Sequence, residues 1–193
     1  SNTLNQFTAI DITTPTYDAD GNMLTNGMGW AYEWDGENRM KAAVSGTRRV
    51  EFAYDYMSRR VEKRIYDGGS LTERKRFVYS GYKHIETLDG ANDSALLQKY
   101  LWSGDRLLAT YDVANAAAYS YLIDGNKNVG QLIDASGNLV AKYEYGPFGQ
   151  LTRCEGSCAD ANPYRFSSEQ YDSTLSAHES VCTRIERLAD AIR

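Results

Sequence analysis

The sequence predicts an all-β protein built from repeated antiparallel hairpins. Three observations predict this fold class: tyrosine dominates the aromatic residues, apolar and polar side chains alternate, and turn residues recur between the alternating stretches. The chain of 193 residues holds 15 tyrosines against 5 phenylalanines and 3 tryptophans, together with 16 glycines. Because a tyrosine ring packs on a pleated surface while its hydroxyl stays hydrated, this bias favours half-buried strands.

Alternation with a period of two marks the clearest strands. Val50, Phe52, Tyr54 and Tyr56 share one face of the first, and Leu139, Ala141, Tyr143 and Tyr145 share one face of the second. Successive side chains of a strand point to opposite faces of the sheet. We therefore expect each set to pack against other residues while the side chains between its members face water.

A Tyr-Asp turn pattern recurs between these strands. Each copy continues with turn residues, then a polar or basic residue, then an apolar one. Asp or Asn at a turn bonds its own backbone two residues on, and Gly or Asn takes the positive φ angle that tight hairpins require. The repeat-defining residues are Tyr17, Asp18, Gly21, Tyr32, Asp35, Gly36, Tyr54, Asp55, Asp124, Gly125, Tyr143, Tyr145, Pro147, Phe148 and Gly149. The repeat predicts a series of hairpins with variable loops.

The last twenty residues depart from this pattern. Val181, Ile185, Leu188 and Ile192 recur at helical spacing, and Ser176 with Glu179 three positions later resembles a capping box. A short amphipathic α-helix is therefore expected from about residue 177. It would cover a sheet edge or offer a handle to a partner. The predicted organisation is a β-sheet domain over 1–172 and a helical tail over 173–193.

Charge is distributed unevenly. The formal net charge is −5, yet residues 39–83 carry twelve Lys and Arg against five Asp and Glu. The acidic total disfavours a nucleic-acid partner, since phosphate binding needs a surplus of cations. The basic runs at 59–64 and 74–76 invite an anionic ligand, but alternation divides them between two faces and favours a solvated surface. Attraction between opposite surfaces of two copies is the alternative reading of the asymmetry.

No catalytic, cofactor or metal site is predicted. Asp18-x-Asp20-x-Asn22 and Asp124-x-Asn126-x-Asn128 lack the Gly and Glu of a calcium loop, which leaves turn chemistry. The two histidines, His84 and His178, are far apart in sequence, and no GxSxG, HExxH or phosphate-loop pattern occurs. Cys154, Cys158 and Cys182 do not have zinc-site spacing, so a loop disulfide or free thiols are expected.

Three tryptophans are candidate contacts for a glycan or a partner. Trp30, Trp34 and Trp102 would stack on sugars if exposed, although core packing explains them equally well. No run of 18 apolar residues occurs, so no membrane span is expected. The first residues, "SNTLNQFTAI", have no signal-peptide character, and an export signal would lie outside this chain.

An ordered series of motifs runs through most of the chain: "YDADGNM" at 17–23, "YEWDGENRM" at 32–40, "YDYMSRRV" at 54–61, "YLIDGNKNV" at 121–129, "LIDASGNLVAKYEYGPFG" at 132–149 and "NPYRFSSEQYD" at 162–172. This series resembles the Rhs/YD-repeat family, whose members include bacterial polymorphic toxins, Tc-toxin components and the animal teneurins. The resemblance implies a ribbon of hairpins that curves or spirals into a hollow shell, which in toxins encloses a C-terminal effector. It also implies a secreted or cell-surface location.

The chain departs from the family after "EQYD". The family pattern continues into a Tyr/Arg-rich strand and an Asp-Pro block near which some members cut themselves, and "SAHESVCTRIERLADAIR" replaces it here. We therefore expect a non-enzymatic structural module, a fragment of an exported repeat shell, able to associate with itself or with neighbouring repeats of a larger chain. The alternatives are a carbohydrate-binding or adhesion module, with a glycan as partner, and a remnant of a toxin-processing domain without its cleavage block.

Overall fold

The computed structural model describes residues 8–9, 13–147, 149–175, 177–179 and 187–188. The first group of strands is β1 (Thr16–Tyr17), β2 (Met23–Thr25), β3 (Ala31–Trp34), β4 (Met40–Ser45), β5 (Arg48–Tyr54), β6 (Arg60–Asp67), β7 (Ser70–Ser80) and β8 (Lys83–Asp89). The second group is β9 (Ala95–Ser103), β10 (Arg106–Asp112), β11 (Ala117–Ile123), β12 (Val129–Asp134), β13 (Leu139–Tyr145) and β14 (Leu151–Glu155). These strands alternate with short turns, as the hairpin pattern predicts.

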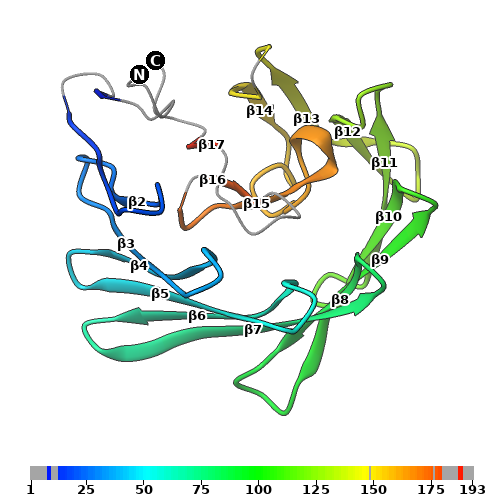
Figure 1. The fold of residues 1–193 in the computed structure, drawn as a ribbon. Helices are drawn as coiled ribbons and strands as arrows, with labels where there is room; N and C mark the ends of the chain where they lie inside the picture. The colour runs from blue at the N-terminus through cyan, green and yellow to red at the C-terminus, as the bar shows by residue number, and fades with distance from the viewer. Residues whose placement is uncertain (1–7, 10–12, 148, 176, 180–186, 189–193) are drawn as a thin grey trace.

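The fourteen strands form one sheet in which each strand pairs with its neighbours in sequence order. Each pairing is antiparallel, as in the long β5/β6 and β6/β7 ladders. Figure 1 shows the sheet bent into an open arc that runs from β2 to β14. The prediction of a curved, all-β sheet of repeated hairpins is therefore confirmed.

A second, smaller sheet lies inside the arc. It consists of β15 (Gln170–Asp172), β16 (Ala177–Glu179) and β17 (Arg187–Leu188), and a single 3-10 turn, η1 (Phe166–Ser168), precedes it. We call residues 159–175, which lead from β14 into this sheet, the inner segment. Figure 1 shows the inner segment in orange on the concave side of the arc.

Two hydrophobic clusters fill the space between the arc and the inner segment. One lies under β9 to β13 and takes Ala159 and Tyr164 from the inner segment. The other lies under β3 to β5 and takes Leu175. The inner segment therefore bridges two parts of the sheet that are far apart along the chain.

The predicted packing faces are confirmed in part. Val50, Phe52, Ala141 and Tyr143 are buried as expected. Tyr56 is 92% exposed because β5 ends at Tyr54 and Tyr56 lies in the turn. Leu139 is 53% exposed because a register irregularity between Leu132 and Ile133 moves it off the packed face. The alternation of buried and exposed side chains therefore breaks down at two sites, one beyond the end of a strand and one at a bulge.

The predicted C-terminal helix falls largely outside the described residues. Where that region is described, at β16 and β17, it is strand, and the helix prediction is wrong there. The physical reason is the hairpin with β15, in which Gln170 pairs with Glu179 and Asp172 with Ala177. The predicted domain boundary at 172/173 stays a prediction. Within the described ranges, no helix has the length and apolar character needed to cross a bilayer.

Candidate functional site

The predicted repeat aspartates build a recurring five-residue turn. The backbone amide of the aspartate donates to the backbone carbonyl of the residue four positions later. The backbone amide of that later residue donates to the aspartate carboxylate. The side chain of that fourth residue, an Asn or Arg, donates to the other carboxylate oxygen. The aspartates are Asp18, Asp35, Asp55, Asp124 and Asp134, and their partners are Asn22, Arg39, Arg59, Asn128 and Asn138. Turn chemistry at Asp18 and Asp124 is thereby confirmed.

In each of these turns, the residue directly before the Asn or Arg has a positive φ angle, in the left-handed region. The φ angles are 87° at Gly21, 60° at Asn38, 60° at Ser58, 66° at Lys127 and 84° at Gly137. Gly149, with a φ of 85°, has the same position in a turn that begins at Gly146. Gly36 and Gly125 follow their aspartates directly and do not have positive φ, so the expectation that they supply it is wrong.

The aromatic residues that precede turns have a shared role. Five of them donate a hydrogen bond to a backbone carbonyl close to the preceding turn on the same rim of the sheet. The bonds are Trp34 to Met23 (2.8 Å), Tyr54 to Met40 (2.9 Å), Tyr79 to Arg60 (3.0 Å), Trp102 to His84 (2.8 Å) and Tyr145 to Val129 (2.8 Å). The tyrosine-rich repeat therefore ties each hairpin to the one before it.

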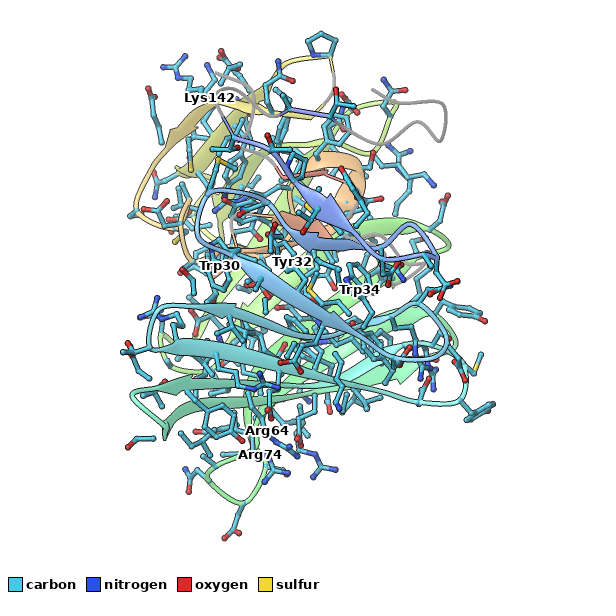
Figure 2. The ribbon with its side chains drawn as sticks, turned by 60° about the vertical axis from the view of Figure 1, so that its left-hand side comes forward. Trp30, Tyr32, Trp34, Arg64, Arg74 and Lys142 are labelled. Carbon is cyan, nitrogen blue, oxygen red and sulfur yellow. The ribbon has the colours of Figure 1, made fainter. Side chains whose placement is uncertain are left out.

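The tryptophans named as sugar contacts are partly buried. Trp30 and Trp34 pack against the cluster that contains Tyr32, and Figure 2 shows these three residues around β3. The Trp102 and Tyr164 rings lie nearly perpendicular, with their centroids 5.6 Å apart, and the Lys83 ammonium lies 5.0 Å from the Trp102 ring centroid. Core packing therefore accounts for much of each ring, and their contact with a sugar stays a prediction.

The inner segment is fixed to the concave face at two polar anchors. The first anchor uses Asn162, which accepts from the Tyr121 hydroxyl (2.7 Å) and donates to the Tyr143 hydroxyl (3.2 Å). The Tyr143 hydroxyl in turn donates to the Ala159 carbonyl (2.7 Å). Burial raises the pKa of Tyr143 to about 12, so the phenol stays a donor. These contacts hold the start of the inner segment against β11 and β13.

His84 extends this first anchor. Its Nδ1 lies 2.8 Å from the Tyr164 hydroxyl and its Nε2 lies 2.8 Å from the Glu86 carbonyl. Burial lowers the pKa of His84 to about 3, so the ring is neutral and its Nε2–H donates to Glu86. The imidazole packs against Phe77 and Tyr100 at ring distances of 5.3 and 4.8 Å. His84 is therefore a packing residue, while the side chain of His178 lies outside the described ones.

The second anchor is a buried ion cluster. The Asp172 carboxylate lies 2.7 Å from the Lys63 ammonium and 3.4 Å from the Arg60 guanidinium. Their side chains are 5%, 9% and 5% exposed respectively. Desolvation raises the pKa of Asp172, but Lys63 and Arg60 outweigh it and the pKa is lowered. Two cations therefore share one buried carboxylate.

The basic runs are divided between the two faces, as alternation predicts. Arg64 and Arg74 pair directly across β6 and β7 on the outer face, where both contact Glu62 (Figure 2). The prediction of a solvated surface is wrong for Arg60 and Lys63, which turn inward. Strict alternation places Arg60 and Lys63 on opposite faces, and the register irregularity between Ala53 and Tyr54 brings Arg60 inward. Their partner Asp172 is 109 residues beyond Lys63.

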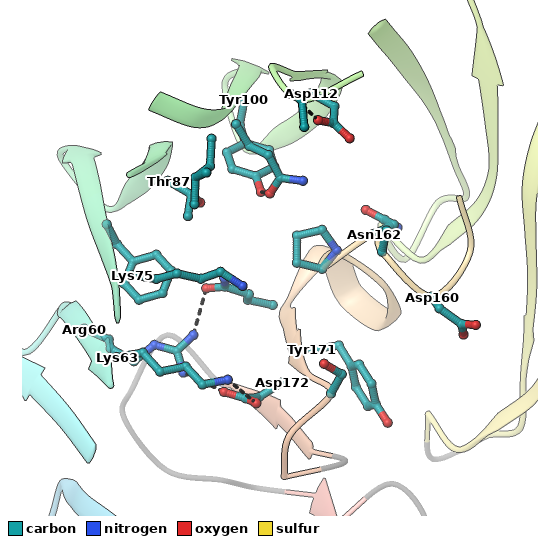
Figure 3. Close-up of a pocket in the computed structure, with 18 residues that line it drawn as sticks. Arg60, Lys63, Lys75, Thr87, Tyr100, Asp112, Asp160, Asn162, Tyr171 and Asp172 are labelled. Carbon is teal, nitrogen blue, oxygen red and sulfur yellow. Dashed lines mark hydrogen bonds and ion pairs between the residues drawn. The ribbon is translucent and has the colours of Figure 1, made fainter. Parts of the chain in front are cut away.

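A pocket of about 270 Å³ lies between the sheet and the inner segment. Its sheet wall includes Arg60, Lys63, Lys75 and Tyr100, and its other wall comes from the inner segment. Figure 3 shows Lys75 reaching into the space above Arg60 and Lys63, with Asp112 and Asp160 on the far side. The pocket is thus polarised, with its cations gathered on β6 and β7.

Metal and thiol chemistry have weak support in the part of the chain that the structure describes. No group of three His, Cys, Asp or Glu side chains there could hold a metal ion. Cys154 and Cys158 are free thiols. The Cys154 sulfur lies 3.7 Å from the Asp160 carboxylate, and burial raises the pKa of its thiol. Cys182 lies outside the described residues.

Solved structures that share this fold include Tc toxins. The chain aligns with the Photorhabdus luminescens Tc holotoxin pore at a TM-score of 0.69 and 15% identity, over 86% of this chain and 9% of that one. It aligns with TcdB2-TccC3 without its hypervariable C-terminal region at a TM-score of 0.69 and 16% identity, over 91% and 9%. The fold is that of a Tc-toxin sheet. The Rhs-type architecture implied by the sequence motifs is confirmed at this level.

Curated relatives in sequence are tRNA nucleases, and no family profile matches the chain. The chain is 28% identical over 175 residues to the tRNA3(Ser)-specific nuclease WapA of Bacillus spizizenii and 27% identical to the tRNA nuclease WapA of Bacillus subtilis strain 168. Each match covers 89% of this chain and 7% of the relative. The chain therefore spans a small part of the curated relatives.

These relatives correct two predictions from the sequence. A non-enzymatic structural module and the absence of enzyme activity were expected, whereas the matched proteins are named nucleases. Short catalytic patterns within this chain carry no information on an activity that resides elsewhere in a much longer protein, and the chain spans 7% of these relatives.

Proposed function

We propose that this chain is part of a toxin that cleaves tRNA, and that its curved sheet holds polypeptide against its concave face. The tRNA activity is inferred from the WapA relatives, of which the chain spans 7%. The holding role is inferred from the chain itself. Its own inner segment runs along the concave face, where Asn162, Tyr164 and Asp172 are all buried.

The contacts on the concave face suit the binding of an extended chain. They come largely from side chains of the sheet to side chains and carbonyls of the inner segment. Among the described residues, one backbone bond joins the inner segment to the sheet, from the Val129 amide to the Arg165 carbonyl at 3.0 Å. Arg165 also stacks on Tyr171 at 4.0 Å and lies over Tyr143 at 5.5 Å. A surface of aromatic side chains with fixed hydroxyl donors can bind a polypeptide without pairing with it as an additional strand of the sheet.

Neighbouring repeats of a larger chain are the proposed partners of the two sheet edges. Among the described strands, β1 and β14 each pair on one side only. An unpaired edge has backbone groups ready for another strand. Continuation of the sheet past both edges would extend the arc. We also propose that the whole protein is secreted.

The nuclease part is tested with the full-length protein that contains this sequence. The purified protein is incubated with total tRNA, and the products are separated on a denaturing gel beside ribosomal RNA as control. Cleavage of one or a few tRNA species at defined positions is expected. Uniform degradation of both RNAs, or no cleavage of tRNA, would reject the proposed activity.

The holding role has a separate test. Limited proteolysis of the 193-residue chain should spare the inner segment and cut exposed turns first, because buried backbone resists proteases. Early cleavage within 159–175 while the sheet remains intact would contradict the role, whatever the result with tRNA.

A further inference from the structure

The Tyr17 hydroxyl is buried without a hydrogen-bond partner, and it is the one tyrosine hydroxyl in that state among the side chains that the structure describes. A phenol that leaves water without gaining an acceptor costs free energy, so such groups are rare in folded proteins. Tyr17 is the last residue of β1, the strand at one edge of the large sheet. Its hydroxyl points to an acceptor that this part of the sheet does not supply.

Tyr17 has the same place in its hairpin as the aromatic residues that tie successive hairpins together. Those five bonds, here called the rim bonds, run from β3, β5, β7, β9 and β13 to the strand before each of them. Tyr17 comes directly before a turn aspartate, as Trp34 and Tyr54 do. The strand β11 has no rim bond because it ends in Ile123, which has no donor in its side chain. By its position, Tyr17 would form the rim bond of β1.

The strand pairing around Tyr17 matches that of the bonded tyrosines. Tyr17 pairs with Met23, six residues later, and a register irregularity lies directly before it. Tyr54 and Tyr145 each pair with the residue six positions later, also directly after an irregularity. A bulge re-aims the side chain that follows it. The shared pairing therefore directs the Tyr17 ring as it directs theirs, toward the position of a strand that would precede β1 in the sheet.

The rim bonds also show which kind of acceptor Tyr17 lacks. In four of the five, the acceptor is the backbone carbonyl of the residue directly after a five-residue aspartate turn. Met23 follows Asn22 and Met40 follows Arg39 in this way. Among the described strands, β1 pairs with β2 alone, so no strand on its other side presents such a carbonyl to Tyr17.

The edge of β1 and the Tyr17 hydroxyl together select a partner. The backbone groups of an edge strand accept an extended chain of almost any sequence. The hydroxyl narrows this choice, since it needs an acceptor at one position beside the rim. A hairpin of this repeat places a carbonyl there, because the donor–acceptor distances of all five rim bonds lie between 2.8 and 3.0 Å.

We propose that the free edge of β1 binds the second strand of another hairpin of this repeat, and that Tyr17 sets the register by donating to the first carbonyl after that hairpin's aspartate turn. Tyr17 is thus a positioning residue. A slip of one residue would remove the acceptor and would also move every side chain of the added strand to the opposite face. This inference rests on the proposed role of neighbouring repeats at the sheet edges, and it names the part of the neighbour that binds.

The test places Tyr17→Phe in two proteins, the 193-residue chain and the full-length protein that contains it. Hydrogen exchange of the peptide that spans β1 is followed by mass spectrometry in both. In the 193-residue chain the substitution should leave exchange unchanged or slow it, because it removes a buried donor that has no acceptor. In the full-length protein β1 should be protected, and the substitution should speed its exchange roughly two- to tenfold, as loss of one hydrogen bond does.

Tyr54→Phe is the matched control. Its bond to the Met40 carbonyl lies within the 193 residues, so the substitution should speed exchange at β4 and β5 by the same factor in both proteins. Tyr56→Phe, at an exposed hydroxyl in the next turn, should have no effect in either. The contrast between Tyr17 and Tyr54 separates a bond to a neighbouring hairpin from a bond within the chain.

Three results would overturn the inference. Faster exchange of Tyr17→Phe in the 193-residue chain would show that the hydroxyl already has a partner there. Protection of β1 in the full-length protein that Tyr17→Phe does not change would remove the register role and leave the neighbouring repeats in place. Protection that is lost on dilution would assign the edge to a second copy. Equal exchange of β1 in the two unmodified proteins would overturn the neighbouring-repeat proposal as well, whereas the tRNA and proteolysis tests are independent of all these outcomes.

Discussion

The Asp172 carboxylate of the inner segment lies 2.7 Å from the Lys63 ammonium of β6, although 109 residues separate them in the chain. Lys63 also donates to the Thr174 hydroxyl at 3.0 Å, and the Thr174 amide donates to Asp172. The pair thus closes a small network at the end of the inner segment. This network connects the middle of the sheet to residues that the repeat pattern places at its end.

Removal of one charge from this pair should be costly. Asp172→Asn leaves Lys63 and Arg60 buried with a neutral partner, and we expect the free energy of unfolding to fall by about 3–5 kcal/mol. Urea unfolding followed by tryptophan fluorescence measures the change. Glu144→Gln, at an exposed ion pair on β13, is the control and should leave the midpoint nearly unchanged. A loss as small as the control's would mean that the buried pair does not hold the segment.

Stability should fall on mild acidification because of His84. Its folded pKa is about 3, below the value near 6.5 of the unfolded chain, so between these values the unfolded chain binds a proton that the folded chain does not. The free energy of unfolding should drop by roughly 1 kcal/mol from pH 6 to pH 5. The pKa of Asp172 is lowered in the folded chain, so its contribution to the free energy of unfolding is lost only below about pH 4. This interval therefore isolates the histidine.

His84→Gln provides the comparison for this pH dependence. The variant is expected to be less stable at every pH, because it loses packing against Phe77 and Tyr100. Its stability should nevertheless change much less between pH 6 and pH 5. An unchanged slope in the variant would show that another group is responsible.

Two glycines provide a matched test of the turn geometry. Gly137 has a φ of 84° with open space around its added Cβ, and Gly36 has open space without positive φ. Gly137→Ala should lower the free energy of unfolding by about 1–2 kcal/mol, the cost of a left-handed residue with a Cβ. Gly36→Ala should be neutral or slightly stabilising. Thermal unfolding of both variants measures the difference, and equal effects would refute the assignment of the strained position to the fourth residue of the turn.

Loss of a tyrosine hydroxyl that bonds the preceding hairpin should lower the stability of the sheet. Tyr54→Phe removes the bond to the Met40 carbonyl and should cost about 0.5–1.5 kcal/mol in the free energy of unfolding. Tyr56→Phe, two residues away at a side chain that is 92% exposed, should have no effect. If both variants unfold alike, the hydroxyl bonds do not contribute to the stability of the repeat.

The hairpin series was predictable because its signals are local. Two signals predict it, and each spans only a few residues: the alternation of apolar and polar side chains around Val50 and Phe52, and the aspartates at the turns. The positive φ falls on Asn38, as the turn chemistry allows, but also on Ser58 and Lys127, where Gly or Asn was expected. The helix predicted at the C-terminus came from spacing alone, which does not register the pairing of β16 with β15.

The candidate site was not predictable because its contacts join distant positions. His84 and Tyr164, and Lys63 and Asp172, meet only after the sheet has curved around the inner segment. The motif at 162–172 identified the inner segment as part of the repeat, but nothing in it names a partner on the sheet. The nuclease activity named for the WapA relatives was not predicted for a different reason, since this chain spans only 7% of those proteins.

Hydrogen exchange at the amides of residues 159–175 tests the central claim most directly. The claim is that the concave face holds this segment through Asp172 and the anchor at Asn162 and Tyr164. We predict that the amides of the segment exchange nearly as slowly as those of β6 and β7, and that Asp172→Asn accelerates the segment while the two strands stay protected. Exchange in the unmodified chain as fast as in the exposed turns, or acceleration of segment and strands together, would contradict it.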